Sequence, residues 1–144
     1  MLLLAVALAK LPSEDLISFQ ETLDALMERS YSWDLWGAAY VIYGGCSDDA
    51  FDYFRAALIM QGEEAFDNAL VEADTLADLP PFTECEAMLG LAYDVYHKRS
   101  GGSSIYDATI EIIYGEPVGE PFLEDDEGGL KDRYAKLFAK YWNK

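Results

Sequence analysis

Apolar residues recur along most of this chain at the three- and four-residue spacing of helices. The clearest case follows Pro12 and Ser13, where acids lie mostly off a single stripe made of Leu16, Phe19, Gln20, Leu23, Leu26 and Met27. This pattern predicts an amphipathic helix of about four turns. The apolar residues 2–11 predict a helix before it, and Pro12 separates the two.

Residues 31–62 hold two Trp, four Tyr and two Phe within 32 positions, which marks the centre of a core. Residues 33–43 are apolar on all sides and predict a buried helix. Ser30 or Ser32 can cap its start, and Gly44 with Gly45 ends it. Ser47 predicts the cap of the next helix, residues 48–61.

Further helices are predicted for residues 63–72, for a segment that runs to about Arg99, and for residues 129–142. A turn at 74–79 separates the first two, and Thr83 with Glu86 forms a capping box before the second. Residues 103–115 fit either a short helix or a β-like segment, and residues 116–128 form an acidic loop. The sequence therefore predicts an all-α, single compact domain of six or seven helices over residues 1–144, with an irregular segment near 103–128.

The charge is large and uneven. Ten bases face 27 acids, giving a net charge of −17, and residues 131–144 alone hold five of those bases and one acid. The predicted C-terminal helix 129–142 is thus basic, while residues 1–130 are acidic, and we expect the basic flank to lie against the acidic remainder. Such a surface repels nucleic acid and anionic membranes, and it suits either solubility or a basic protein partner.

Two features of the sequence concern the compartment. The opening apolar run is only about nine residues long and lacks a basic segment before it, so it predicts neither a signal peptide nor a membrane span. Cys46 and Cys85 belong to no metal-ligand spacing and are expected to be reduced thiols in a cytoplasmic protein.

No phosphate-binding loop, dinucleotide fingerprint, zinc motif or nucleophile elbow occurs, so we expect no cofactor and no metal, and the sequence leans away from an enzyme. Asp48 and Asp49 fit the first turn of a helix better than a metal site. His97 lies near a helix end without a placed nucleophile, and Cys46 fits a structural role.

Arg55 is the exception on the apolar face of its helix, between Phe51 and Ile59. It is either a structural ion pair with Asp52, Asp34 or Asp48, or a clamp for an anion. The aromatic residues beside it are either core or pocket wall. The candidate ligand-binding residues are Trp33, Asp34, Trp36, Asp48, Asp49 and Arg55.

Two acidic groups are the candidates for contacting a partner. One lies on the amphipathic helix predicted after Pro12 and Ser13, and the other lies in the acidic loop. These candidate partner-binding residues are Glu21, Asp24, Glu28, Glu124, Asp125, Asp126 and Glu127.

Several blocks of the sequence resemble the bacterial domain of unknown function 4240. They are YSWDLWGAAYVIYGGCSDDAFDYFRAALIMQG, LADLP, ECEAMLGLAYDVY and GEPFLEDDEGGLKDRYAKLFAKYW, in that order. The resemblance implies a helical domain in bacteria, and it supplies no activity and no catalytic residues.

Three functions stay open at this point. The first is an interaction module of the immunity, inhibitor or adaptor type that binds a basic protein surface. The second is a small-molecule or anion-binding enzyme with its site between helices 33–43 and 48–61, around Arg55. The third is a structural accessory domain.

Overall fold

The computed structural model describes residues 1–81 and 84–142, and these residues form eight α-helices and two 3-10 helices. The helices are α1 (Leu2–Ala9), α2 (Ser13–Arg29), α3 (Trp33–Tyr43), α4 (Asp48–Ile59), α5 (Glu63–Val71), η1 (Ala73–Asp78), α6 (Glu86–Ser100), η2 (Ile105–Asp107), α7 (Glu127–Arg133) and α8 (Ala135–Tyr141). The all-α prediction is confirmed, and the eight α-helices of the described residues are slightly more than the six or seven expected. Thr83 of the expected capping box lies outside the described residues, and α6 begins at Glu86.

Local sequence signals set the ends of α3 and α4. The Ser32 hydroxyl accepts a hydrogen bond from the Leu35 amide at 3.1 Å, and Ser47 caps α4 through the Ala50 amide at 3.2 Å. Gly44 ends α3 at φ 72°, a left-handed conformation that suits glycine. The two helices therefore begin where the sequence predicted.

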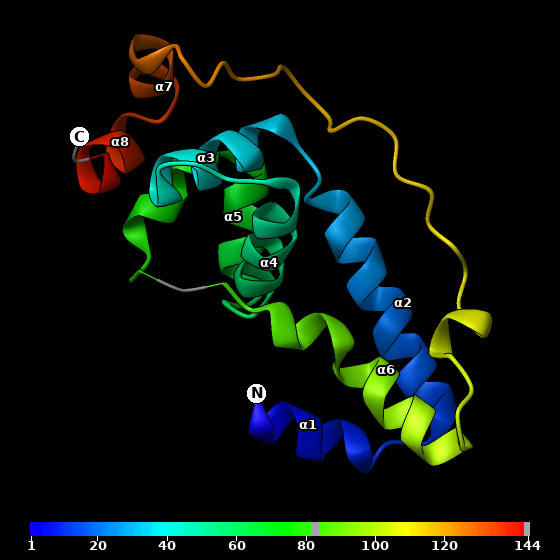
Figure 1. The fold of residues 1–144 in the computed structure, drawn as a ribbon. Helices are drawn as coiled ribbons and strands as arrows, with labels where there is room; N and C mark the ends of the chain where they lie inside the picture. Colours follow the sequence, from blue (N-terminus) through cyan, green and yellow to red (C-terminus); the bar gives the residue numbers. More distant parts are fainter. Residues whose placement is uncertain (82–83, 143–144) are drawn as a thin grey trace.

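The largest core cluster joins α3, α4, α5, η1, α7 and α8. It includes Leu35, Phe51, Phe54, Phe66 and Leu137, all buried. A second cluster joins α1, α2 and α6, which lie together at the other end of the molecule (Figure 1). The contacts of α2 and α6 with α4 connect the two ends.

The C-terminal helix predicted for 129–142 is wrong in one respect, because it is two helices, α7 and α8. The chain breaks at Tyr134, whose φ of −129° and ψ of 57° are not helical. The basic flank does lie against acidic neighbours, as expected: Arg133 pairs with Asp34, and Lys136 Nζ lies 3.9 Å from Asp78. Lys140 donates instead to backbone carbonyls.

Residues 108–126 form an irregular segment that runs past α2 towards α7 (Figure 1). Before it, the 103–107 stretch holds only the single turn η2. Val118 is one point at which this segment is attached, because its amide donates to Tyr31 O at 3.1 Å and its carbonyl accepts from the Trp33 amide at 2.9 Å. This contact brings residues 114–122 beside the start of α3.

Candidate functional site

A pocket of about 250 Å³ opens beside Arg55, where the end of α2, the start of α3, α4 and the irregular segment meet. We call it the Arg55 pocket. Its lining residues are Met27, Tyr31, Trp36, Asp48, Asp52, Arg55 and Tyr114.

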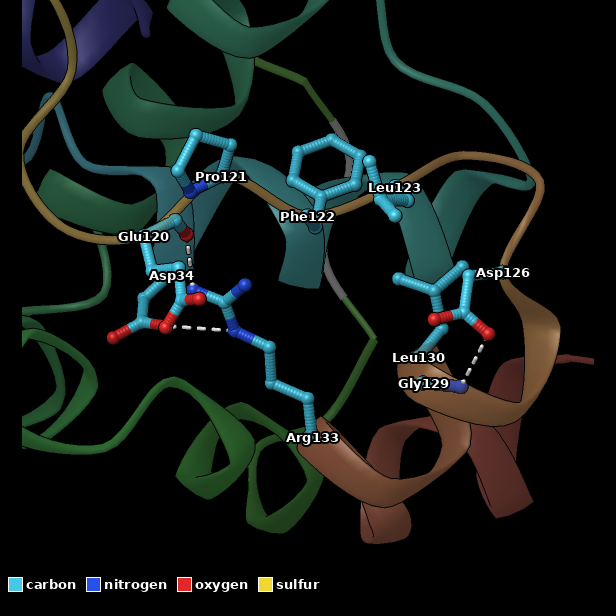
Figure 2. Close-up of a pocket in the computed structure, with 9 residues that line it drawn as sticks. All are labelled: Asp34, Glu120, Pro121, Phe122, Leu123, Asp126, Gly129, Leu130 and Arg133. Atoms are coloured by element: carbon cyan, nitrogen blue, oxygen red, sulfur yellow. Dashed lines mark hydrogen bonds and ion pairs between the residues drawn. The ribbon is translucent and has the colours of Figure 1, made fainter.

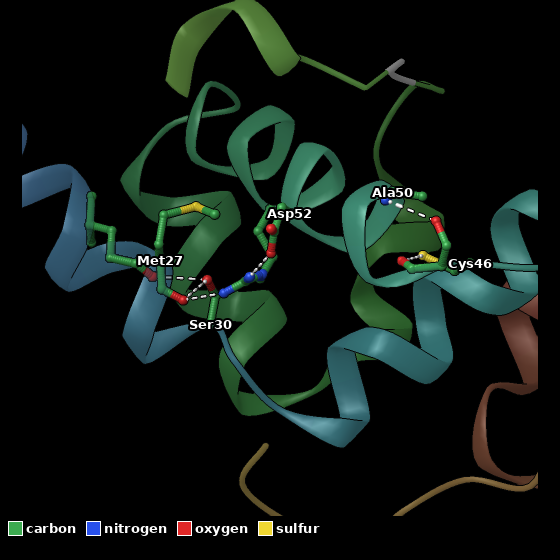
Figure 3. A network of polar contacts seen from close by, with 8 residues as sticks. Met27, Ser30, Cys46, Ala50 and Asp52 are labelled. Carbon is green, nitrogen blue, oxygen red and sulfur yellow. Dashed lines mark hydrogen bonds and ion pairs between the residues drawn. The ribbon is translucent and has the colours of Figure 1, made fainter. Parts of the chain in front are cut away.

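The Arg55 side chain belongs to the wall of this pocket and is only 2% exposed. Its Nη1 donates to the Met27 carbonyl and its Nη2 pairs with Asp52 Oδ1. The Met27 carbonyl also accepts from the buried Ser30 hydroxyl at 3.2 Å, and Figure 3 shows Met27, Ser30 and Asp52 in this network. Arg55 therefore fastens α4 to the end of α2, while its remaining Nε is buried without a hydrogen-bond partner among the described residues.

Aromatic rings enclose the guanidinium. Its carbon lies 4.9 Å from the centroid of the Tyr31 ring and 4.7 Å from that of Phe51. Trp36 stacks on Phe51 at 4.7 Å, and Tyr114 meets Tyr31 edge-on at 5.3 Å. Since ring faces attract cations, this cluster compensates part of the cost of burying the charge.

Burial and nearby charges shift the pKa of Tyr114, in the wall of the pocket, and of Cys46, which lies outside its lining. Burial raises the pKa of Tyr114, and the nearby positive charge of Arg55 opposes that rise. Burial, followed by the negative charges of Glu84 and Asp48, raises the pKa of the Cys46 thiol to about 12. Cys46 is therefore a poor nucleophile, and its carbonyl accepts the Trp36 indole N–H at 2.9 Å.

A second pocket, of about 580 Å³, lies between α3, α7 and the irregular segment (Figure 2). We call it the Arg133 pocket. Arg133 Nε donates to Asp34 Oδ1 at 3.0 Å, and its Nη2 donates to the Glu120 carbonyl at 2.7 Å. Asp126 also lines it and accepts from the Gly129 amide at 3.0 Å, which caps α7. Of the charged groups in this pocket, Arg133 and Asp34 are thus paired with each other, while the Asp126 carboxylate is bonded to a backbone amide.

The structure divides the candidate ligand-binding residues. Three of them line the Arg55 pocket, namely Trp36, Asp48 and Arg55. Asp34 instead forms an ion pair with Arg133. Trp33 lies outside the lining and stacks on Trp36 at 5.4 Å.

Asp49 is exposed in the first turn of α4 and does not line the Arg55 pocket. Sequence reasoning did not select Tyr31 and Tyr114 as wall residues. Tyr31 lay within the aromatic stretch, but nothing in the sequence pointed to Tyr114, because it comes from the segment without a predicted conformation.

The candidate partner-binding residues of α2 differ in their surroundings. Glu28 is exposed, Glu21 is half-buried, and Asp24 accepts a hydrogen bond from Gln20 Nε2 at 2.8 Å. Burial raises the pKa of Asp24, which the bond from Gln20 partly offsets.

In the acidic loop, all four side chains are exposed. Two of them also act within the fold, because Asp126 caps α7 and Glu127 Oε1 accepts the Trp142 indole N–H at 3.0 Å. The acidic loop is thus presented to solvent as a whole, whereas on α2 only Glu28 of the three candidates is fully exposed.

Two further properties hold for residues 1–81 and 84–142. No group of three or more His, Cys, Asp or Glu side chains there could hold a metal ion. Nor does any helix in those ranges have the length and apolar character required to cross a membrane.

Comparison with known proteins gave one match. A family model described as "Protein of unknown function (DUF4240)" matches residues 1–98 of the 144. No curated protein and no solved structure matched the chain. The matched range includes α1 to α5, η1 and nearly all of α6, together with six of the seven residues that line the Arg55 pocket.

Proposed function

The chain belongs to the DUF4240 family of proteins of unknown function, and from this starting point we propose that it is a small acidic interaction module that binds a basic surface of another protein. The observation that carries the proposal is the excess of carboxylates without a basic partner. Of the 27 acids, those in ion pairs among the described residues are Asp34, Asp52, Asp67 and Asp78.

The uncompensated charge supports binding in a specific way. The net charge of −17 creates a negative potential that speeds encounter with basic proteins and disfavours acidic ones. The C-terminal bases are already counted in this net charge, and one of them, Arg133, is paired with the carboxylate of Asp34. The partner we propose is therefore a protein with a basic face.

The experiment is affinity capture on the full chain, washed at about 50 mM and then at about 500 mM salt, followed by affinity measurement with the purified partner. We expect a partner with a basic surface whose affinity falls steeply between the two salt concentrations. A partner retained equally at both concentrations, or no partner at the lower one, would contradict the proposal.

Charge variants locate the contact. Glu124→Gln with Asp125→Asn changes the acidic loop without touching the cap of α7, and Glu21→Gln with Glu28→Gln changes α2 while leaving the bond between Gln20 and Asp24 in place. The pair that weakens binding identifies the contact surface. The other pair, with the same change in charge, is its matched control.

The second candidate function, a small-molecule or anion-binding enzyme around Arg55, is supported by the pocket itself. Its weakness is that the guanidinium is 2% exposed and already bound to Asp52 and Met27. A screen of small carboxylates and phosphates, with the Trp36 indole resonance as the readout, tests it. Saturable binding of an anion that Arg55→Lys weakens would favour this function over the interaction module.

A further inference from the structure

The Arg55 pocket offers a ligand negative charge and aromatic surface rather than a positive charge. Arg55 is 2% exposed, and its Nε is buried. An anion entering the pocket would thus find hardly any accessible donor of the guanidinium, and it would meet the carboxylates of Asp48 and Asp52 in the wall. This combination disfavours an anionic ligand.

The carboxylates of the pocket are not equivalent. Asp52 is paired with Arg55, whereas Asp48 forms no ion pair with any described residue. The three charged groups of the wall therefore carry a net charge of −1, within a protein whose net charge is −17. A cation that enters the pocket gains a partner without displacing one.

The walls have the chemistry that such a cation requires. The rings of Tyr31, Trp36 and Tyr114 line the pocket, and the Tyr31 ring already holds the Arg55 guanidinium at 4.9 Å. Aromatic faces beside a carboxylate are a common setting for Lys, Arg and other organic cations. The volume, about 250 Å³, lies below that of pockets for drug-sized ligands and suits a single side chain.

We propose that the Arg55 pocket receives one basic side chain, Lys or Arg, from the partner protein, with Asp48 as its counterion. This inference rests on the proposed function, since the partner must be basic. It assigns Asp48 and the three rings to recognition, and it leaves Arg55 and Asp52 as the pair that holds the wall in place.

The test uses the full chain and two probes, acetyl-Gly-Arg-Gly-amide and the same peptide with neutral citrulline in place of Arg. The readout is the NMR signal of the Trp36 indole N–H, which is bonded to the Cys46 carbonyl at 2.9 Å and is assigned with Trp36→Phe. We expect the Arg peptide to shift this signal saturably at about 20 mM salt, and the citrulline peptide to leave it unchanged.

Two neighbouring acids provide matched variants. Asp48→Asn and Asp49→Asn remove the same charge from the same turn of α4, but only Asp48 lines the pocket. We expect Asp48→Asn to lower the affinity for the Arg peptide by about five- to tenfold, and Asp49→Asn to lower it by less than about twofold. Tyr114→Leu should also lower the affinity for the Arg peptide. Because Tyr114 lies outside the helices, this variant tests the pocket without changing the stability of α4.

A longer basic peptide of nine arginines separates this inference from the function on which it rests. If that peptide binds the wild-type chain at low salt and both Asp variants equally, the acidic module stands and the pocket inference fails. Failure of the nine-arginine peptide to bind at low salt contradicts the proposed function. Equal shifts with the Arg and citrulline peptides would also overturn the inference.

Discussion

The phenol ring of Tyr134 packs directly against Gly37, so that a Cβ atom at Gly37 would lie 2.3 Å from the Tyr134 hydroxyl oxygen. That hydroxyl donates to the Asp34 carbonyl at 2.8 Å, and the preceding residue, Arg133, binds the Asp34 side chain. The junction of α7 and α8 is thus fixed onto one turn of α3. This contact accompanies the break at Tyr134, where a single straight helix was expected.

The first prediction concerns Gly37→Ala. In an ordinary helix interior this change stabilises by about 0.5–1 kcal/mol, since alanine restricts the unfolded chain. Here we expect it to lower the free energy of unfolding by about 1–3 kcal/mol, because the methyl group overlaps the Tyr134 ring. Urea denaturation measures the change. Gly90→Ala in α6 is the control. A Cβ atom there would lie 4.0 Å from its nearest neighbour, Asp94 Oδ2, so we expect this change to raise the free energy of unfolding.

A second variant isolates the contact. Tyr134→Phe alone removes the hydrogen bond to Asp34 and should cost about 1 kcal/mol. Combined with Gly37→Ala it should cost less than the sum of the two single changes, because the closest clashing atom has gone. Strict additivity, or a stable Gly37→Ala protein, would show that the Tyr134 ring does not occupy this place.

The second prediction concerns the ion pair of Arg133 and Asp34. The two side chains are 27% and 62% exposed, so solvent screens them and the coupling should be small, about 0.5–1 kcal/mol. A double-mutant cycle with Arg133→Met and Asp34→Asn, repeated at high salt, measures it. We expect the coupling to shrink as salt rises. A coupling that salt leaves unchanged would indicate that the bond to the Glu120 carbonyl, not the charge, dominates.

The sequence predicted these helices because each carries local signals. Ser32, Ser47 and Gly44 act within a few residues of themselves, so the ends of α3 and the start of α4 could be read directly. The break at Tyr134 could not, since it accompanies packing against Gly37, 97 positions away in the chain.

The candidate site shows the same division. That Arg55 is paired with Asp52 could be predicted, because the two are three residues apart on one helix. Two other contacts depend on how the irregular segment and α7 pack against α3. They are the ion pair of Asp34 with Arg133 and the place of Tyr114 in the lining of the Arg55 pocket. No local pattern encodes contacts across 99 positions, as between Asp34 and Arg133.

The third prediction concerns Arg55 and Asp52. Asp52→Asn leaves a guanidinium that is 2% exposed without its counterion, and we expect a loss of about 2–4 kcal/mol. Adding Arg55→Met should restore part of this loss, because the double variant buries no unpaired charge. Thermal and urea unfolding of the three variants test the order. A double variant less stable than Asp52→Asn would mean that the bonds of Arg55 to Met27 and the rings outweigh the charge.

The last prediction uses the thiol of Cys46, whose pKa is raised to about 12 by burial and by Glu84 and Asp48. Because only the thiolate reacts, iodoacetamide at about pH 8 should modify Cys46 in the folded protein roughly a hundredfold more slowly than in the urea-unfolded chain.

The raised pKa of Cys46 should also change how the reaction rate depends on pH. The rate of a thiol of ordinary pKa, about 8.5, levels off near pH 10, whereas the rate at Cys46 should still rise about tenfold per pH unit between about pH 9 and pH 11. A Cys85→Ser background assigns the signal to Cys46, and Cys46→Ser reports the other thiol as a control. A rate that levels off near pH 10 in the folded protein would show that burial and the nearby carboxylates do not raise the pKa of Cys46. Asp48→Asn should lower the pKa of Cys46 and speed the reaction, since it removes one of the negative charges that oppose the thiolate.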